Sequence, residues 1–181
     1  GSDVLGTVDV MPGGAAANVA VWAHRLGADA RFVAKVGDDT LGALMLAHLR
    51  SEDIAGDVIT VAGGLTTRVG ILVSSDGEHS FVIDHTKLLL FAEGDVAVSL
   101  LDEVDAVFFN AYDIILARSA SFLEPLLAEA RSRHLPVAFD PSSFTLIESY
   151  GARRLLDDVG PLDVLIANED EIRALTGTAG P

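Results

Sequence analysis

The amino-acid sequence predicts an α/β fold, with a mostly parallel sheet covered by helices and a small antiparallel patch beside it. Short apolar segments such as Val104 to Phe109 and Pro136 to Phe139 alternate along the chain with helical patterns. Because polar residues do not alternate with apolar ones in these segments, we expect strands that are buried on both faces, as in a parallel sheet. Elsewhere, Asp76-Gly77 lies between apolar segments at 66–73 and 79–83, which predicts a β-hairpin. Half of the 181 residues are hydrophobic, enough to form a core.

Helix start and stop signals define several boundaries. Gly27 ends the small apolar helix that begins at residue 15, and Asp39 is a candidate N-cap for the helix that follows it. Pro125 lies inside a helical pattern over residues 116–133, so that helix kinks or starts late. In chain order, we expect a strand over 4–11, a helix over 15–26, a strand over 31–36, a helix over 40–50, the hairpin, a strand over 104–109, a helix over 116–133, strands over 136–139 and 164–167, and a helix over 169–175.

The hairpin and residues 4–11 have the same strand-like character, so we expect them to form one small antiparallel sheet. Such a sheet beside an α/β core is typical of a lid over a cleft. An antiparallel edge of the main sheet is the alternative interpretation.

Charge and composition exclude several classes of function. The chain carries 27 Asp and Glu against 12 Lys and Arg, a net charge of −15 that repels nucleic acids and anionic membranes. It has no cysteine, which excludes disulfides, thiolate zinc sites and a cysteine nucleophile, and which fits a reducing compartment. The five histidines have no metal-ligand spacing. No apolar run is long enough to span a membrane and no signal peptide is visible, so we expect a cytoplasmic protein.

One glycine-rich turn points to ligand binding. In Pro12-Gly13-Gly14-Ala15-Ala16-Ala17-Asn18, two glycines open a helix whose first turn is mostly alanine. A ligand can approach such a backbone closely, and the free amides at the helix start are hydrogen-bond donors. The Asn18 side chain offers both a donor and an acceptor, which suits a hydroxyl group. A tight turn that only packs a helix is the alternative.

The spacing of residues after this turn resembles that of a known family. Gly37 opens the sequence Gly-Asp-Asp-Thr-Leu-Gly, similar to a Gly-x-Asp-x-x-Gly motif. The chain resembles the first signature of the PfkB carbohydrate kinases, the ribokinase-like sugar and nucleoside kinases, and the resemblance extends from residue 3 to the end. The matching positions are Gly13, Gly14, Asn18, Ala20, Gly27 and Gly37.

This resemblance implies a partial ribokinase-like domain over residues 1–181, with a three-layer α/β/α arrangement and a β lid. It implies transfer of the γ-phosphoryl group of ATP, with Mg²⁺, to a hydroxyl of a small sugar that Gly13, Gly14 and Asn18 bind. Lid segments at about 3–11, 66–74 and 79–85 would close over the sugar, and family members often dimerise through this lid. We therefore expect a homodimer whose ligands are a sugar and ATP.

A second motif, Asn168-Glu169-Asp170-Glu171, follows the strand expected over 164–167. It resembles the Asn-x-x-Glu of the family, in which the Asn and the final Glu lie near the phosphates and the magnesium. Mg²⁺ prefers oxygen ligands and retains waters, so Glu171 could hold it through a water molecule. An acidic first turn that complements the helix dipole is the alternative explanation.

Four other residues are substrate-binding candidates. Asn110 and Tyr112 follow the strand over 104–109, where the family often places a substrate-facing residue. Some members have a carboxylate at the position of Tyr112. Asp140-Pro141 resembles the Asp-Pro of ketodeoxygluconate and fructose kinases, in which an Asn and an Arg usually follow. Because Ser142, Ser143 and Phe144 follow here, a ketodeoxygluconate-type acid is a doubtful substrate. Arg68 begins a lid strand and could face the sugar.

The catalytic base of the family is the Asp of a Gly-Ala-Gly-Asp sequence, which this chain does not contain. Its Gly-Asp pairs at 37–38, 56–57 and 94–95 lie in other contexts. We therefore expect a partial chain, with the base beyond Pro181. A nucleoside kinase of the same family and a non-catalytic, sugar-sensing relative are alternatives. A dinucleotide-binding oxidoreductase ranks last because Gly-x-Gly-x-x-Gly is missing. The low aromatic content of 6% favours a sugar over a nucleoside, whose binding sites often use aromatic stacking.

Overall fold

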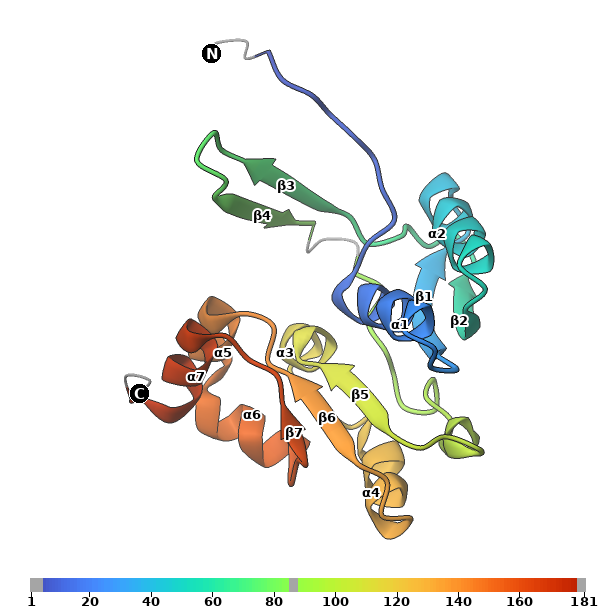
Figure 1. The fold of residues 1–181 in the computed structure, drawn as a ribbon, viewed down its shortest axis with the longest axis vertical. Helices are drawn as coiled ribbons and strands as arrows, with labels where there is room; N and C mark the ends of the chain where they lie inside the picture. The colour runs from blue at the N-terminus through green and yellow to red at the C-terminus, as the bar shows by residue number, and fades with distance from the viewer. Residues whose placement is uncertain (1–4, 85–87, 179–181) are drawn as a thin grey trace.

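The computed structural model describes residues 5–84 and 88–178, which contain two parallel sheets and one antiparallel hairpin (Figure 1). The predicted α/β class is confirmed, although the parallel strands form two sheets instead of one. The orders are β1-β2, β3-β4 and β5-β6-β7. The strands are β1 (Arg31–Gly37), β2 (Ala55–Val61), β3 (Val69–Val73), β4 (His79–Ile83), β5 (Val107–Asn110), β6 (Val137–Asp140) and β7 (Val164–Leu165).

Helices connect the parallel strands. The Asp39 carboxylate accepts a hydrogen bond of 2.8 Å from the amide of Gly42, which confirms the expected N-cap. No helix in the described parts of the chain is long and apolar enough to cross a membrane. The helices are α1 (Ala15–Arg25), α2 (Thr40–Ser51), the 3₁₀ helix η2 (Val98–Leu101), α3 (Tyr112–Ala117), α4 (Glu124–Ser132), α5 (Phe144–Tyr150), α6 (Ala152–Val159) and α7 (Glu169–Thr176).

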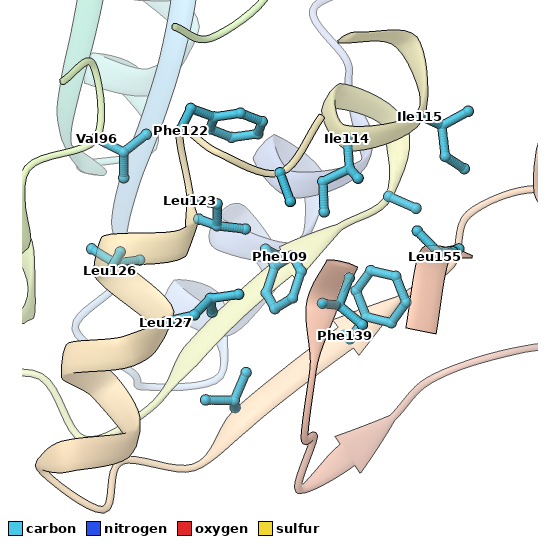
Figure 2. Close-up of a cluster of buried hydrophobic side chains, with 14 of the residues drawn as sticks. Val96, Phe109, Ile114, Ile115, Phe122, Leu123, Leu126, Leu127, Phe139 and Leu155 are labelled. Atoms are coloured by element: carbon cyan, nitrogen blue, oxygen red, sulfur yellow. The ribbon is translucent and has the colours of Figure 1, made fainter. Parts of the chain in front are cut away.

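The main core lies around the three-stranded sheet (Figure 2). Phe109 of β5 and Phe139 of β6 are buried, with ring centroids 4.9 Å apart. Ile114 of α3, Leu127 of α4 and Leu155 of α6 pack around them, as Figure 2 shows. A smaller core joins α1 and α2 to the β1-β2 sheet, and α1 also contacts β5. This second contact links the two parallel sheets.

The β3-β4 hairpin extends away from both parallel sheets, at the upper left of Figure 1. Its register pairs Val69 with Ile83 and Val73 with His79, as the Asp-Gly turn predicted. The residues of β3 are all exposed, in spite of their apolar character. The hairpin is therefore a separate element with no core of its own.

The expected strand over residues 4–11 is wrong for the described part of that range. Residues 5–11 form no strand, and the Leu5 side chain is fully exposed (100%). Among residues 5–84 and 88–178, no strand pairs with this segment, so its apolar side chains have no sheet to join there. Residues 3 and 4 of this lid segment, and residue 85 of another, lie outside the described residues.

Several boundaries also differ from the expectation. The pattern over 116–133 is two helices: α3 ends at Ala117 with Arg118 in a left-handed conformation (φ 54°), and Pro125 lies in the first turn of α4. Pro125 therefore marks a late start instead of a kink. No sequence pattern predicted β2, α5 or α6, and the strands expected over 104–109 and 164–167 are shorter in the structure, as β5 and β7.

Candidate functional site

The first candidate feature is the glycine turn before α1. Gly14 has φ 107°, a backbone conformation that side chains rarely adopt, so a glycine is required there. A Cβ at Gly13 would meet no atom within 4 Å, so the space beside this turn is open. Asn18 is exposed, and its backbone amide donates to the Gly14 carbonyl (2.9 Å) as α1 begins. Among the described residues, its side chain has no hydrogen-bond partner.

The Gly-x-Asp-x-x-Gly motif at 37–42 is a packing junction. A Cβ at Gly37 would lie 2.3 Å from the Gly64 carbonyl oxygen, and one at Gly42 would lie 2.1 Å from the Gly37 oxygen. The Thr66 hydroxyl donates to Asp39 Oδ1 (2.6 Å) and accepts from the Gly37 amide (3.0 Å). These bonds hold the pKa of Asp39 below its usual value, the Thr66 hydroxyl first and the Gly42 amide second. The motif thus fixes the segment that leads into the hairpin.

A charge near the carboxyl end of β1 reaches the segment that follows β5. Lys35, close to the end of β1, forms a half-buried ion pair with Asp95 (2.6 Å). Its charge also acts on Asp113, which lies three residues after the end of β5. Since α1 leads into the parallel strand β1 and packs along it, the start of α1 lies toward this same edge. In open α/β sheets, ligands bind outside the carboxyl ends of the strands.

Candidates on β5 and β6 meet at the strand ends. Asn110 and Asp140 are register partners, and the Ala111 amide donates to the Asp140 carbonyl (2.9 Å). Each side chain also caps its own turn: Asn110 Oδ1 accepts from the amide of Tyr112 (3.0 Å), and Asp140 Oδ1 accepts from that of Ser142 (2.7 Å). One carboxylate oxygen of Asp140 and the amide nitrogen of Asn110 remain for a ligand.

Tyr112 connects this pair to the second motif. Burial raises the pKa of the Tyr112 phenol, and the charges of Asp140 and Glu171 raise it further. The structure therefore brings Asp140 and Glu171, which lie far from Tyr112 in the sequence, within electrostatic reach of its phenol. A hydroxyl beside two carboxylates can bind a ligand that carries several hydroxyl groups.

The Asn168-Glu171 motif forms a capping box at the start of α7. Asn168 Oδ1 accepts from the Glu171 amide (2.9 Å), and Glu171 Oε2 accepts from the Asn168 amide (3.0 Å). Glu171 is only 7% exposed, whereas Glu169 and Asp170 are exposed and pair with Arg173. The helix-dipole explanation thus fits Glu169 and Asp170, but it does not account for the burial of Glu171.

Arg68 lies apart from this group, at the base of the hairpin. It pairs with Asp84 at 3.9 Å, with both side chains partly exposed, and its charge acts on Asp39. The structure therefore groups Arg68 with the junction around Thr66, apart from Asn110, Tyr112 and Asp140 near the ends of β5 and β6.

Sequence reasoning missed Asp113. This carboxylate is half-buried in the first turn of α3, and burial raises its pKa to about 6, although Lys35 acts in the opposite direction. It makes no hydrogen bond to any other described residue. Its position after Tyr112, in an otherwise apolar turn, is the signal that could have identified it.

Comparisons with known proteins identify related sequences and structures. The model of the pfkB family carbohydrate kinase matches residues 3–181. Fructokinase-1 of Oryza sativa subsp. japonica is 27% identical over 172 residues, which cover 92% of this chain and 53% of that protein. Probable fructokinase-7 of Arabidopsis thaliana is 28% identical over 178 residues, 94% of this chain and 51% of that protein. The chain thus spans about half the length of these curated relatives.

Two solved structures show the same fold. The 2-dehydro-3-deoxygluconokinase of Thermotoga maritima has a TM-score of 0.80 at 26% identity, covering 92% of this chain and 53% of that one. An uncharacterized sugar kinase from Pyrococcus horikoshii, in complex with ATP, has a TM-score of 0.79 at 23% identity, with 91% and 56% covered. The three-layer ribokinase-like class expected from the sequence is therefore confirmed.

Proposed function

This chain belongs to the pfkB family of carbohydrate kinases, and we propose that it forms the sugar-binding part of a kinase that transfers the γ-phosphoryl group of ATP to a sugar hydroxyl. The observation that carries the proposal is the grouping of Tyr112, Asp140 and Glu171 at the carboxyl ends of adjacent parallel strands. Hydroxyl-binding side chains and a buried carboxylate meet there. Phosphoryl transfer depends mainly on positioning and charge neutralisation, which such a site can provide.

The sugar lies, in this proposal, between the start of α1 and the ends of β5 and β6. Amides of Gly13 and Gly14 and the side chain of Asn18 bind hydroxyls from one side. Asn110, Tyr112 and Asp140 bind them from the other, and Arg68 approaches from the hairpin base. Two carboxylates close to Tyr112 favour a neutral sugar over a sugar acid. The rice and Arabidopsis relatives are named fructokinases, so fructose is the first candidate substrate.

The phosphates of ATP lie, in this proposal, near the start of α7. Asn168 is exposed there and its amide nitrogen is free to donate, because the cap uses only its oxygen. The described residues contain no cluster of three acidic or histidine side chains able to hold a metal alone. They do fit a magnesium ion held mostly by phosphates and water, with Glu171 as one partner. Bound there, Mg²⁺ would neutralise charge on the phosphates.

The hairpin serves as the lid in this proposal, and also as a homodimer contact. Val69, Ile71 and Val73 of β3 and Phe81 of β4 fall on one face, and all four are exposed. An exposed apolar strand face of this kind is typical of a surface that pairs or closes over a ligand. A cytoplasmic location is part of the same proposal, because a chain without cysteine suits a reducing compartment.

The experiment uses the full-length protein that contains this chain, assayed for ATP consumption with pentoses, hexoses and nucleosides. We expect sugar-dependent turnover, with fructose among the best substrates. Asn18→Ala should lower kcat/KM for the sugar by roughly tenfold to a hundredfold, because a hydroxyl of the bound sugar loses its hydrogen-bond partner. The KM for ATP should not change. Val19→Ala, on the next exposed position of α1, is the matched control.

Two results would contradict the proposal. No sugar-dependent turnover by the folded full-length protein would favour a non-catalytic, sugar-sensing relative. Turnover with nucleosides only would favour a nucleoside kinase. Normal sugar kinetics of Asn18→Ala would remove Asn18 from the site but leave the reaction class intact.

A further inference from the structure

A cavity of about 410 Å³ lies between α4 and α6, and none of the candidate site residues lines it. This volume falls within the range of small-molecule sites. Its wall combines guanidinium groups with hydroxyls from the turn before α4. The residues that provide them are Arg118, Ser119, Ser121, Arg131 and Arg154.

Arg118 distinguishes this cavity from a network of ion pairs that only stabilises the fold. Its guanidinium carbon lies 5.7 Å from the centroid of the Tyr150 ring, and in the described parts of the chain it makes no hydrogen bond or ion pair. Arg154 stacks on the same ring at 4.4 Å and donates to the Arg118 carbonyl (2.7 Å). The ring therefore holds the Arg118 side chain in the cavity wall while leaving its donors free.

The carboxylates around the cavity are mostly neutralised. Asp158 lies 3.7 Å from Arg154 and accepts a hydrogen bond from the Tyr150 hydroxyl, and Asp157 pairs with Arg153 at 3.1 Å. Glu124 is a further carboxylate of the wall and has no arginine partner among the described residues.

Arg131 adds positive charge that no carboxylate of the described residues pairs with, because its guanidinium donates to the carbonyls of Val159 and Pro161 at the end of α6. Three arginines and three carboxylates line this cavity. Because Asp157 pairs with Arg153 outside the lining and Asp158 pairs with Arg154, Arg118 and Arg131 remain against Glu124 alone. These two guanidinium groups give an anion a local partner in a chain whose net charge is −15.

The serines supply neutral donors at the same place. The Ser119 hydroxyl donates to Ser121 Oγ (3.0 Å), and the Ser121 amide donates to Ser119 Oγ (3.1 Å). The hydroxyl hydrogen of Ser121 is thus left to donate to a ligand. A planar guanidinium beside a hydroxyl donor matches the oxygens of a phosphate group.

We propose that this cavity, between α4 and α6, binds the phosphate group of a small phosphate ester, at a place separate from the candidate sugar site. Arg118 and the Ser121 hydroxyl bind the phosphate oxygens, and Arg131 and Arg154 add charge. Glu124 accepts from hydroxyls on the organic part of the ligand. A second ligand site on the helical layer would allow a phosphorylated metabolite to regulate the protein.

The test titrates the full-length protein that contains this chain with inorganic phosphate, at constant ionic strength set with chloride, and follows binding by calorimetry and amide NMR shifts. We expect saturable binding and shifts at Ser119 and Ser121. Arg118→Gln should raise the Kd roughly tenfold or more, since a charge-assisted contact is lost. Arg50→Gln removes the same charge from an exposed position of α2 and should bind as the wild type does. In Asn168→Ala, which changes the other proposed phosphate position, the shifts at Ser119 and Ser121 should persist.

If Arg118→Gln does not fold, Arg118→Lys takes its place, because lysine keeps the charge but loses the planar donor pair. We then expect binding weakened by about threefold. Phosphate binding that is absent, that is equal in the Arg118 and Arg50 variants, or that is lost only in Asn168→Ala would overturn the proposal. The last result would place the ion near α7 instead.

Discussion

Glu171 combines a structural and a proposed functional task in one side chain. One carboxylate oxygen closes the capping box of α7, and the charge of the same group acts on Tyr112. Its low exposure of 7% means that the charge is poorly screened by water. The two tasks can be separated by substitution, because the cap needs an acceptor and the metal proposal needs a negative charge.

Glu171→Gln keeps an oxygen acceptor for the Asn168 amide and removes the charge. We expect its melting temperature to stay near that of the wild type. In the full-length enzyme, the Mg²⁺ concentration for half-maximal rate should rise, and high Mg²⁺ should partly restore turnover. Glu169→Gln, on the exposed side of the same helix turn, is the control and should leave both unchanged. Identical Mg²⁺ dependence of the two variants would show that Glu171 only caps the helix.

Asp113 predicts a pH dependence of stability. Burial raises its pKa from 3.8 to about 6, so the folded chain binds this proton more tightly than the unfolded chain does. The contribution to stability is therefore complete below about pH 4, and it is lost as the pH rises through about 6. Asp113→Asn should be more stable than the wild type at pH 8, by on the order of 1–3 kcal/mol, and similar to it at pH 4.

Urea unfolding of the chain at pH 4, 6 and 8 measures this difference. Asp105→Asn, at an exposed loop position, is the control and should follow the wild type at all three pH values. An Asp113→Asn variant whose stability difference does not change with pH would contradict the assignment.

At the scale of elements, single residues predicted the secondary structure correctly where one local interaction, such as a helix cap or a turn, dominates. Asp39 caps α2 and Asp76-Gly77 turns the hairpin, as expected from residue type alone. Pro125 left two interpretations open, and the left-handed Arg118 decides between them by ending α3 early. Residues 55–61 did not reveal β2, because strand pairing with β1 outweighs a sequence that begins Ala-Gly-Asp.

The hairpin is the element whose exposed face carries the dimer proposal. Phe81 lies opposite Ile71 on the more apolar face, whereas Ser80 lies on the other face. Phe81→Lys should raise the dimer Kd roughly tenfold to a hundredfold, because it removes the burial of one large apolar side chain and places a charge there. Ser80→Lys introduces the same charge on the opposite face and should have little effect. Sedimentation velocity over a concentration series measures both, and a monomeric wild type would refute the dimer.

At the scale of the whole molecule, the position of the candidate site could be predicted from the sequence, whereas the contacts among its residues could not. Strand ends at Asn110 and Asp140 could be predicted to share an edge, since the carboxyl ends of parallel strands meet there. The approach of Glu171 to Tyr112 could not, because it depends on how α7 packs against α5 and α5 against α3. The burial of Asp113 and the cavity between α4 and α6 also depend on packing, and no sequence motif predicts them.

The last prediction concerns the 181-residue chain expressed by itself. It contains no Gly-Ala-Gly-Asp sequence, and Val164 and Leu165 of β7 and the following Ile166 are exposed. We expect no sugar-dependent ATP consumption, because preorganised donors at the transferring group are each worth roughly 10²–10³-fold in rate. We also expect the exposed β7 face to bind a hydrophobic dye, more strongly than the full-length protein does.

The measurement combines intact mass with ATP consumption over a panel of sugars and nucleosides. Robust turnover by a chain of 19.0 kDa would contradict the expectation that the base lies beyond Pro181. Such turnover would indicate that one of the carboxylates of this chain accepts the proton. Asp113 and Asp140 would then be the first residues to substitute.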